Sequence, residues 1–581
     1  MKIEQVVNFV VRFFDILLLT ILVFDFGFTL HEDYERPKLI GLAVIPLIIY
    51  VFNIYKYFFF KDSSKKKVAL ATSTLLAIIL FSSIIVGLIN RDLGVFNALM
   101  IIRPVLEGGL IFYFLLRLMM MVRYIYNVYY NPAMMFVVSF FTIIMAGTFL
   151  LLLPSATTDG ITFTNAFFTS TSAVCVTGLI VVDTATAFTP VGQFIILGLI
   201  QIGGIGILTF TSFFAFFFRG SSSFKEGLNV KDFIAQDSLK DVLQTAMNIV
   251  NFTLIIELIG ACFIYFSISE NTVIPNKIFF SVFHSVSAFC NAGFSTFSDG
   301  LSETSVQFNY ALQWVIMVLI VFGGLGYHIA FNFALYIKRK FIKLTGGKLA
   351  QQNVRIITLN TRIVIYTTLI LIIGGWAFVF ISEYYATLQA HTSLLGKITT
   401  SAFNAITPRT AGFNTVDFTT MNVSTLLFII FLMWIGGSPA STAGGIKTST
   451  FALATLNIFS IAKGKTRIEI FGRRISSDST GRAFAIICMS LIIIGTGIVT
   501  IISFEPEGTD ILTVVFECFS AYSTVGLTLN HTPLFTENSK YVLIALMFLG
   551  RIGLMTLLMG VFRQMQHQRF YEYPKENILI N

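Results

Sequence analysis

The stretch Ser172-Ala-Val-Cys-Val-Thr-Gly-Leu179 decides how this chain is organised, because related stretches occur three more times. They are Ser287-Ala-Phe-Cys-Asn-Ala-Gly-Phe294, Ile406-Thr-Pro-Arg-Thr-Ala-Gly-Phe413 and Ser520-Ala-Tyr-Ser-Thr-Val-Gly-Leu527. The glycine that they share recurs after 115, 119 and 114 residues, as Gly178, Gly293, Gly412 and Gly526. Because this spacing is nearly constant, it predicts four copies of one structural unit.

The composition predicts a protein that crosses a membrane several times. The chain has 581 residues, of which 55% are hydrophobic and 12% charged, with a mean hydropathy of +0.82. Before the first repeat, residues 1–125 form an extension with apolar runs at 6–28, 39–60, 68–89 and 95–118, each long enough to span a bilayer. No small-residue cleavage site follows the first run, so we expect a retained span and not a signal peptide.

Each repeat is expected to contain a spanning helix, a segment of about ten residues, the glycine stretch and a second spanning helix. The predicted units are 132–218, 242–337, 363–461 and 483–563, followed by a cytosolic tail at 564–581. Because the short segment is too short to span the membrane, we expect it to enter and leave on the same side. Each unit then spans the membrane twice, so all four have the same orientation. The predicted fold is therefore all-α, with four units in pseudo-fourfold symmetry round a central pore.

The charge distribution predicts the orientation. With a cytosolic amino terminus, most of the 39 Lys and Arg residues fall on the cytosolic side, as the positive-inside rule requires. The glycine stretches then lie on the outer side. The net charge of +9 is explained in this way, so we expect membrane lipid and no nucleic acid as its partner.

The four glycine stretches suit the binding of a dehydrated monovalent cation. Such an ion needs rings of oxygens in place of its water, and backbone carbonyls supply them where glycine allows unusual dihedral angles. Close helix packing is the alternative role of such glycines, but four matching copies favour an ion filter. We call the predicted filter residues the glycine segments: Val176, Thr177, Gly178, Leu179, Asn291, Ala292, Gly293, Phe294, Thr410, Ala411, Gly412, Phe413, Thr524, Val525, Gly526 and Leu527.

A second set of glycines occurs in the second spanning helices, at 203–206, 323–326, 436–439 and 550–553. In the third unit a run of small residues follows, which supports a continuous helix poorly. We therefore expect a loop beneath the filter there, a helix kink being the alternative. This small-residue loop consists of Gly436, Gly437, Ser438, Pro439, Ala440, Ser441, Thr442, Ala443, Gly444 and Gly445. A buried Arg551 needs a partner, and the carbonyls of the loop are the candidates. Lys447 either holds the loop or extends to the inner interface.

These motifs resemble the TrkH/KtrB superfamily of potassium transporters. The resemblance rests on the glycine stretches, on Arg409-Thr-Ala-Gly-Phe-Asn-Thr415 and on Gly436-Gly-Ser-Pro-Ala-Ser-Thr-Ala-Gly-Gly-Ile-Lys447, and it covers about 132–565. It implies four fused channel-like subunits that conduct K⁺ inward, with K⁺ as the transported ion and no covalent cofactor. It also implies that 436–445 is a gating loop held by Arg551. Because Gly178 is not replaced by serine, it implies a preference for K⁺ over Na⁺.

The same resemblance implies a homodimer in the bacterial cytoplasmic membrane and a cytosolic nucleotide-binding regulatory ring of the TrkA/KtrA type. The basic segments 338–348 and 463–474 are its expected docking surface. Whether Na⁺ or H⁺ is carried together with K⁺, as in a symporter, stays open. A membrane enzyme is disfavoured, because the six histidines are scattered and neither HExxH nor GxSxG occurs. A sodium-coupled solute carrier would favour inverted repeats.

Several polar residues are compatible with two roles. Glu257 suits either ion coupling or a buried contact between helices, and Arg103 either a sensor or an interhelical hydrogen bond. Cys175 and Cys290 are expected to pack, without metal or redox chemistry. Carboxylates that either attract cations at the outer mouth or are solvated loop charges are Asp183, Asp299, Asp417 and Glu517.

Overall fold

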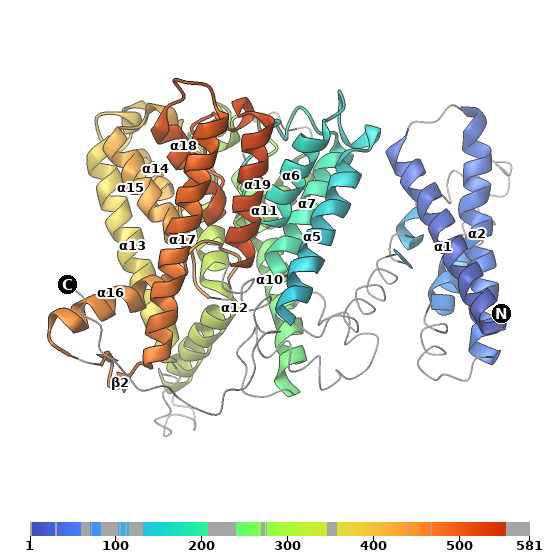
Figure 1. The fold of residues 1–581 in the computed structure, drawn as a ribbon, viewed down its shortest axis with the longest axis horizontal. Helices are drawn as coiled ribbons and strands as arrows, with labels where there is room; N and C mark the ends of the chain where they lie inside the picture. The colour runs from blue at the N-terminus through green and yellow to red at the C-terminus, as the bar shows by residue number, and fades with distance from the viewer. Residues whose placement is uncertain are drawn as a thin grey trace.

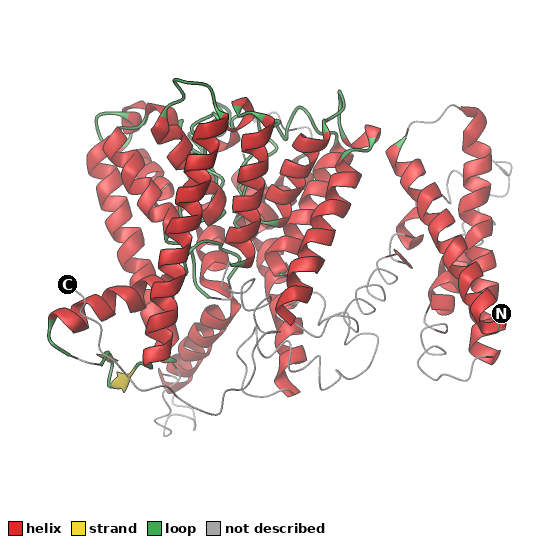
Figure 2. Ribbon diagram, viewed as in Figure 1, coloured by secondary structure: helices red, strands yellow, loops and turns green. Residues whose placement is uncertain are grey.

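The computed structural model describes residues 3–28, 32–59, 70, 72–82, 103, 106–110, 113–114, 132–206, 240–268, 274, 276–344, 357–439, 441–465 and 467–553. Within these ranges the chain is mostly helical, and its strands are β1 (Glu469–Ile470) and β2 (Arg473–Arg474), which pair in antiparallel fashion (Figure 2). Of the predicted functional residues, Ala440 lies outside these ranges. The tail at 564–581 and much of the extension also lie outside the described ranges.

Most helices run side by side along one direction, whereas α16 crosses it steeply at the lower left of Figure 1. The helices are α1 (Ile3–Gly27), α2 (Glu32–Phe59), α5 (Pro132–Leu151), α6 (Phe163–Val174), α7 (Pro190–Ile205), α10 (Lys240–Ser267), α11 (Lys277–Cys290), α12 (Tyr310–Leu344), α13 (Leu359–Glu383), α14 (Leu394–Ile406), α15 (Val423–Trp434), α16 (Thr448–Ala462), α17 (Ser477–Phe504), α18 (Ile511–Ser523) and α19 (Glu537–Ile552). Short 3₁₀ helices are η2 (Pro154–Ala156), η3 (Gly300–Ser302), η5 (Thr387–Ala390), η6 (Phe418–Thr420) and η7 (Thr532–Leu534).

The helices confirm a multi-pass membrane protein. Among the described residues, four helices are long and apolar enough to cross a bilayer, and a fifth span results if the two halves of the bent α12 are joined. The four are Ile40–Phe59, Met247–Ser267, Leu359–Glu383 and Ser477–Phe504. The expected span at 191–218 appears only as α7, because the residues after 206 are not described.

Four short helices, α6, α11, α14 and α18, precede the four glycine segments. Each begins at a polar residue whose side chain accepts a hydrogen bond from a backbone amide of the first turn, namely Thr162, Asn276, Ser393 and Asp510. Such caps satisfy amides that have no partner within the helix. The four helices are buried at their carboxyl ends, so their negative dipole ends lie inside the protein.

The second helices are interrupted where the sequence predicted continuous spans. Gly206 ends α7 with φ 81°, and Gly553 ends α19 with φ 78°. Within α12, Gly326 has φ 73° and ψ 161°, and the helix bends by 105° at this break. A positive φ is incompatible with an α-helix and is readily adopted by glycine. The prediction of continuous second helices in the first, second and fourth units is therefore wrong.

The extension has a core of its own, to which Leu18, Leu42, Leu76 and Leu110 contribute. Its first helix, α1, reaches the rest of the protein at its end, where a Cβ on Gly27 would meet Leu153 Cδ2 at 2.7 Å. The third and fourth expected spans of the extension fall mostly outside the described residues.

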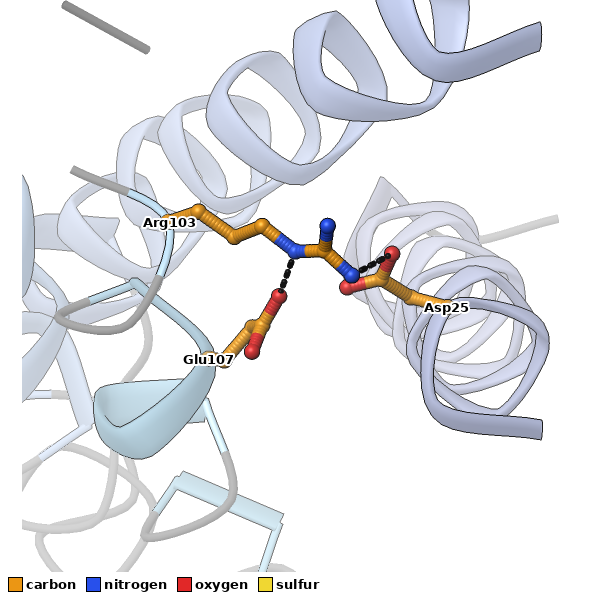
Figure 3. A network of polar contacts seen from close by, with 3 residues as sticks. All are labelled: Asp25, Arg103 and Glu107. Carbon is orange, nitrogen blue, oxygen red and sulfur yellow. Dashed lines mark hydrogen bonds and ion pairs between the residues drawn. The ribbon is translucent and has the colours of Figure 1, made fainter. Parts of the chain in front are cut away.

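Arg103 makes a contact between helices, one of the two roles that the sequence analysis considered. Its guanidinium lies 3.0 Å from Asp25 of α1 and also donates to Glu107 (Figure 3). A charged group in a membrane segment is costly unless it is paired, and this ion pair lowers that cost. The contact joins the first and fourth predicted spans of the extension.

Candidate ion filter and gate

The four glycines lie against one another in a closed ring. A Cβ built on Gly178 would collide with the Ala292 carbonyl, and one on Gly293 would lie 2.8 Å from the Ala411 carbonyl. In the same way Gly412 faces the Val525 carbonyl, and Gly526 faces the Thr177 carbonyl. Each glycine therefore contacts the carbonyl that precedes the next glycine, and the fourth segment closes the ring on the first.

The backbone has the same shape in all four segments. The first residue of each segment is left-handed, with φ values of 55°, 61°, 73° and 51° at Val176, Asn291, Thr410 and Thr524. The glycine, two residues later, is left-handed again, with φ between 70° and 91°. Two left-handed residues separated by one other residue turn the chain sharply out of each short helix.

Hydrogen bonds turn the amides of the segments back toward their own short helices. The amides of Thr177, Ala292 and Val525 donate to carbonyls five residues earlier at 2.8, 2.7 and 2.9 Å. In the third segment Ala411 donates to Thr407 at 2.9 Å. With these amides occupied, the carbonyls of the same residues lie at the ring of glycines. An arrangement of this kind offers oxygens to a cation.

A cavity of about 420 Å³ lies on one side of the ring, and the four glycines form part of its wall. Asp183, Asp299 and Asp417 also line it, as the sequence analysis allowed. Partial burial raises the pKa of nearby Glu303, and the carboxylates of Asp299 and Asp183 raise it further. Carboxylates collected at a cavity wall make its potential negative and attract cations.

Glu517 has neither of the two roles expected for it, because it is fully buried within α18. Its carboxylate accepts hydrogen bonds from the Leu529 amide at 3.1 Å, from the Thr532 hydroxyl at 2.8 Å and from the Thr528 hydroxyl. It therefore holds the chain that follows the fourth glycine segment, and it is not among the residues that line the cavity beside the ring of glycines.

Replacing Glu517 by alanine removes these three bonds and leaves buried donors without a partner. An ordinary hydrogen bond contributes about 0.5–1.5 kcal/mol, and a buried donor left unpaired costs more, so we expect the thermal unfolding temperature in detergent to fall by several degrees. Glu507→Ala, which removes an exposed carboxylate that follows α17, is the matched control and should leave it unchanged. Equal unfolding temperatures for the two variants would contradict the assigned contacts.

The small-residue loop connects α15 to α16, and hydrogen bonds join its first residues to those that follow its end. The Gly436 amide donates to the Ile446 carbonyl and the Thr448 amide to the Gly437 carbonyl, both at 2.9 Å. Its inner residues reach the glycine segments, since a Cβ on Gly444 would collide with the Thr524 hydroxyl. The loop therefore packs against the start of the fourth glycine segment.

Arg551 of α19 has the kind of partner that was expected for it. Its guanidinium donates to the Thr442 carbonyl of the loop and, at 2.7 Å, to the Gly203 carbonyl near the broken end of α7. Lys447 is half-buried and donates from Nζ to the Ala443 carbonyl at 2.5 Å, so it contacts the loop. Two cationic side chains therefore bind carbonyls of the loop.

Comparison with known proteins identifies the family. Residues 110–573 match the family TrkH, described as cation transport protein. The chain belongs to this family. It is 33% identical over 455 residues to the potassium/sodium uptake protein NtpJ of Enterococcus hirae, covering 78% of this chain and 97% of that protein. It is 36% identical over 429 residues to Ktr system potassium uptake protein B of Bacillus subtilis, covering 74% and 92%.

The crystal structure of the potassium transporter TrkH from Vibrio parahaemolyticus has a similar fold, with a TM-score of 0.59. The likeness covers 89% of this chain and 97% of that chain, at 16% sequence identity. At this sequence identity, the likeness shows a similar fold and nothing further.

Sequence reasoning missed one further contact in this TrkH-family chain. Arg409, directly before the third glycine segment, is 8% exposed and donates to the Gly436 carbonyl at 3.2 Å. The signal was available, because a buried arginine stands where the first two units have Cys175 and Cys290. Those cysteines are buried, and Cys290 lies 3.5 Å from the Glu257 carboxylate.

Glu257 itself makes a buried contact between helices. It is 5% exposed and accepts a hydrogen bond from Gln201 of α7 at 2.9 Å. This contact joins α10 to α7 beside Cys290, which directly precedes the second glycine segment, and it agrees with the structural role that the sequence analysis considered.

Proposed function

We propose that this protein takes up K⁺ through a filter made of the four glycine segments. The observation that carries the proposal is the closed ring, in which each glycine faces the carbonyl that precedes the next. A K⁺ ion on the axis of such a ring would exchange its water for carbonyl oxygens. The four units, 132–218, 242–337, 363–461 and 483–563, would then surround one central pore.

The choice of K⁺ over Na⁺ rests on the glycine at position 178 and on the names of the relatives. Ktr system potassium uptake protein B of Bacillus subtilis is named for K⁺, whereas NtpJ of Enterococcus hirae is named for both ions. Na⁺ is therefore the competitor that a test must include. Uptake is driven at least by the membrane potential, which contributes about 2.3 kcal/mol per charge per 100 mV.

The small-residue loop is the proposed gate. The proposal is supported by the contact of the loop with Thr524 of the fourth glycine segment, and by Arg551, Lys447 and Arg409, each of which binds one of its carbonyls. A segment held by a few hydrogen bonds can leave without unfolding a helix. In this proposal the arginines stabilise the closed position of the loop.

The proposed assembly is a homodimer in the bacterial cytoplasmic membrane, with a cytosolic amino terminus and a nucleotide-binding regulatory ring on the inner side. The inner basic segments 338–348 and 463–474 are the proposed docking surface. Part of the second segment is described, and there Arg473 and Arg474 are exposed on the β1–β2 hairpin. At its turn, Phe471 stacks on Tyr366 of α13, which holds the hairpin in place.

Reversing the charge of this hairpin tests the docking surface. Arg473→Glu with Arg474→Glu should abolish nucleotide control of Rb⁺ flux, because an acidic ring surface would be repelled, while the K⁺ to Na⁺ ratio stays unchanged. Arg482→Glu, an exposed position at the start of α17, is the matched control. Normal nucleotide control in the double variant would exclude the hairpin from the interface.

Growth of a potassium-uptake-deficient bacterium at low external K⁺ tests the proposed function. We expect the chain to restore growth when a regulatory ring is co-expressed. Gly178→Ser should restore it less well, and increasingly poorly as external Na⁺ rises. Failure of the wild type to restore growth despite normal membrane expression would contradict K⁺ uptake.

A further inference from the structure

The broken end of α12 is bonded to the small-residue loop. The Ser438 amide donates to the Gly324 carbonyl at 2.9 Å, and the Thr442 amide donates to the Gly323 carbonyl at 3.4 Å. The Ser438 hydroxyl donates to the next carbonyl, that of Leu325. Ser438 is 1% exposed, so these bonds are shielded from water. The loop therefore caps three successive carbonyls where the first half of α12 ends.

A continuous α12 would use the same three carbonyls itself. In an α-helix each carbonyl accepts from the amide four residues later, so these three would bond the amides of residues 327 to 329. Gly326, with φ 73° and ψ 161°, lies between these carbonyls and amides and prevents that pattern. The next turn of a continuous helix would occupy the space directly beyond the carbonyls, where the amides of the loop now lie. The loop and a straight α12 would therefore compete for the same carbonyls.

We infer that α12 and the small-residue loop form one switch, in which the kink at Gly326 keeps the loop closed and straightening of α12 releases it. Ser438 is the positioning residue of this switch, because it bonds two of the three carbonyls. The inference rests on the proposed function, since it assigns the control of the same conduction path.

Two features of the chain suit such a switch. Glycine adopts both helical and left-handed dihedral angles at little cost, so position 326 can exist in either state. The two ends of the loop are joined by the hydrogen bonds that the amides of Gly436 and Thr448 donate, so the loop can move as a unit. Beyond the kink, α12 continues to Leu344 in the inner basic segment, so a partner bound there would act directly on the second half of α12.

Rb⁺ flux into proteoliposomes, measured without a regulatory ring, tests the switch with two variants. Gly326→Ala disfavours the left-handed angle and favours a straight α12, while Ser438→Ala removes the hydroxyl bond to Leu325. We expect each to raise the flux roughly fivefold, because the positive φ costs alanine about as much at position 326 as one ordinary hydrogen bond contributes at Ser438. The double variant should fall well short of the product of the two effects, because both act on the same contact. The K⁺ to Na⁺ ratio should be preserved in all three.

Gly374→Ala is the matched control, because this glycine of α13 is helical and faces open space. It should leave the flux unchanged. The inference is overturned if both single variants have the flux of the wild type. It is also overturned if the flux of the double variant rises by the product of the two single effects. If Gly326→Ala does not fold, Ser438→Ala alone decides, since unchanged flux in that variant overturns the inference. A wild type that conducts no Rb⁺, also when a regulatory ring is supplied, contradicts the proposed function instead.

Discussion

Gly178→Ser is expected to reduce the preference for Rb⁺ over Na⁺ roughly tenfold, a change of about 1.4 kcal/mol in the relative stabilisation of the two ions. Two causes act together. The backbone at Gly178 has φ 91°, which disfavours any side chain, and a Cβ there would collide with the Ala292 carbonyl of the next segment. The ring must then shift, and the carbonyls no longer match the spacing that replaces the hydration shell of the larger ion.

The measurement is Rb⁺ uptake by proteoliposomes in rising external Na⁺. Gly198→Ala provides the control, because this glycine of α7 has no atom within 4 Å of a built Cβ. It should behave as the wild type. Unchanged discrimination in Gly178→Ser, with normal uptake, would remove the first glycine segment from the filter.

Arg551→Ala is expected to raise the uptake of Rb⁺ in the absence of a regulatory ring by roughly tenfold or more. The variant loses the hydrogen bonds to the Thr442 and Gly203 carbonyls, and bonds to a charged donor contribute about 1.5–3 kcal/mol each. If these bonds hold the loop closed, their loss shifts the loop toward the open position. Selectivity should be retained, since Arg551 contacts no carbonyl of the glycine segments among its described hydrogen bonds.

Lysine at position 551 separates charge from geometry. A lysine keeps the positive charge but lacks the planar fork with which the guanidinium reaches two carbonyls, so Arg551→Lys should lie between wild type and alanine. Flux that falls in Arg551→Ala, at normal expression and selectivity, would show that Arg551 supports conduction and does not restrain it.

The membrane location and helical content followed directly from the sequence, because apolar runs of spanning length have few other solutions. The sequence also predicted that the four glycine segments lie together, since parallel repeats bring equivalent positions to one axis. Whether they conduct ions stays a prediction. The polar residues that cap the four short helices also stand in the sequence just before each of them, where such caps are common.

The helix breaks could have been predicted but were not. Gly206, Gly326 and Gly553 stand at the last position of the repeated glycine motif, and only the third copy was interpreted as a break. Glycines within a membrane span usually indicate close packing between helices, so the glycines of the other three units were not interpreted as breaks. At two of these breaks the structure shows what bonds the nearby carbonyls: Arg551 bonds that of Gly203 before Gly206, and the small-residue loop bonds those of Gly323 and Gly324 before Gly326.

The contact of Glu517 could not be predicted from local sequence, and the partner of Arg409 could not be named from it, although the replacement of a cysteine by arginine in the third unit was visible. Glu517 is buried because the chain after the fourth glycine segment folds back over α18, and that path depends on tertiary packing. Arg409 reaches Gly436 across 27 residues because the loop folds beneath the third segment. From its neighbours in the sequence alone, Glu517 was expected to be a charge at the outer mouth or a solvated loop charge.

The most direct test of the account is Rb⁺ uptake by proteoliposomes that contain the purified wild-type chain, with an imposed inside-negative potential. The account predicts uptake above that of empty vesicles, unaffected by a roughly tenfold excess of Na⁺ and suppressed by the same excess of unlabelled K⁺. Suppression by Na⁺ as strong as that by K⁺ would contradict the K⁺-selective filter. Uptake no greater than that of empty vesicles, also with a regulatory ring supplied, would contradict conduction through the ring of glycines.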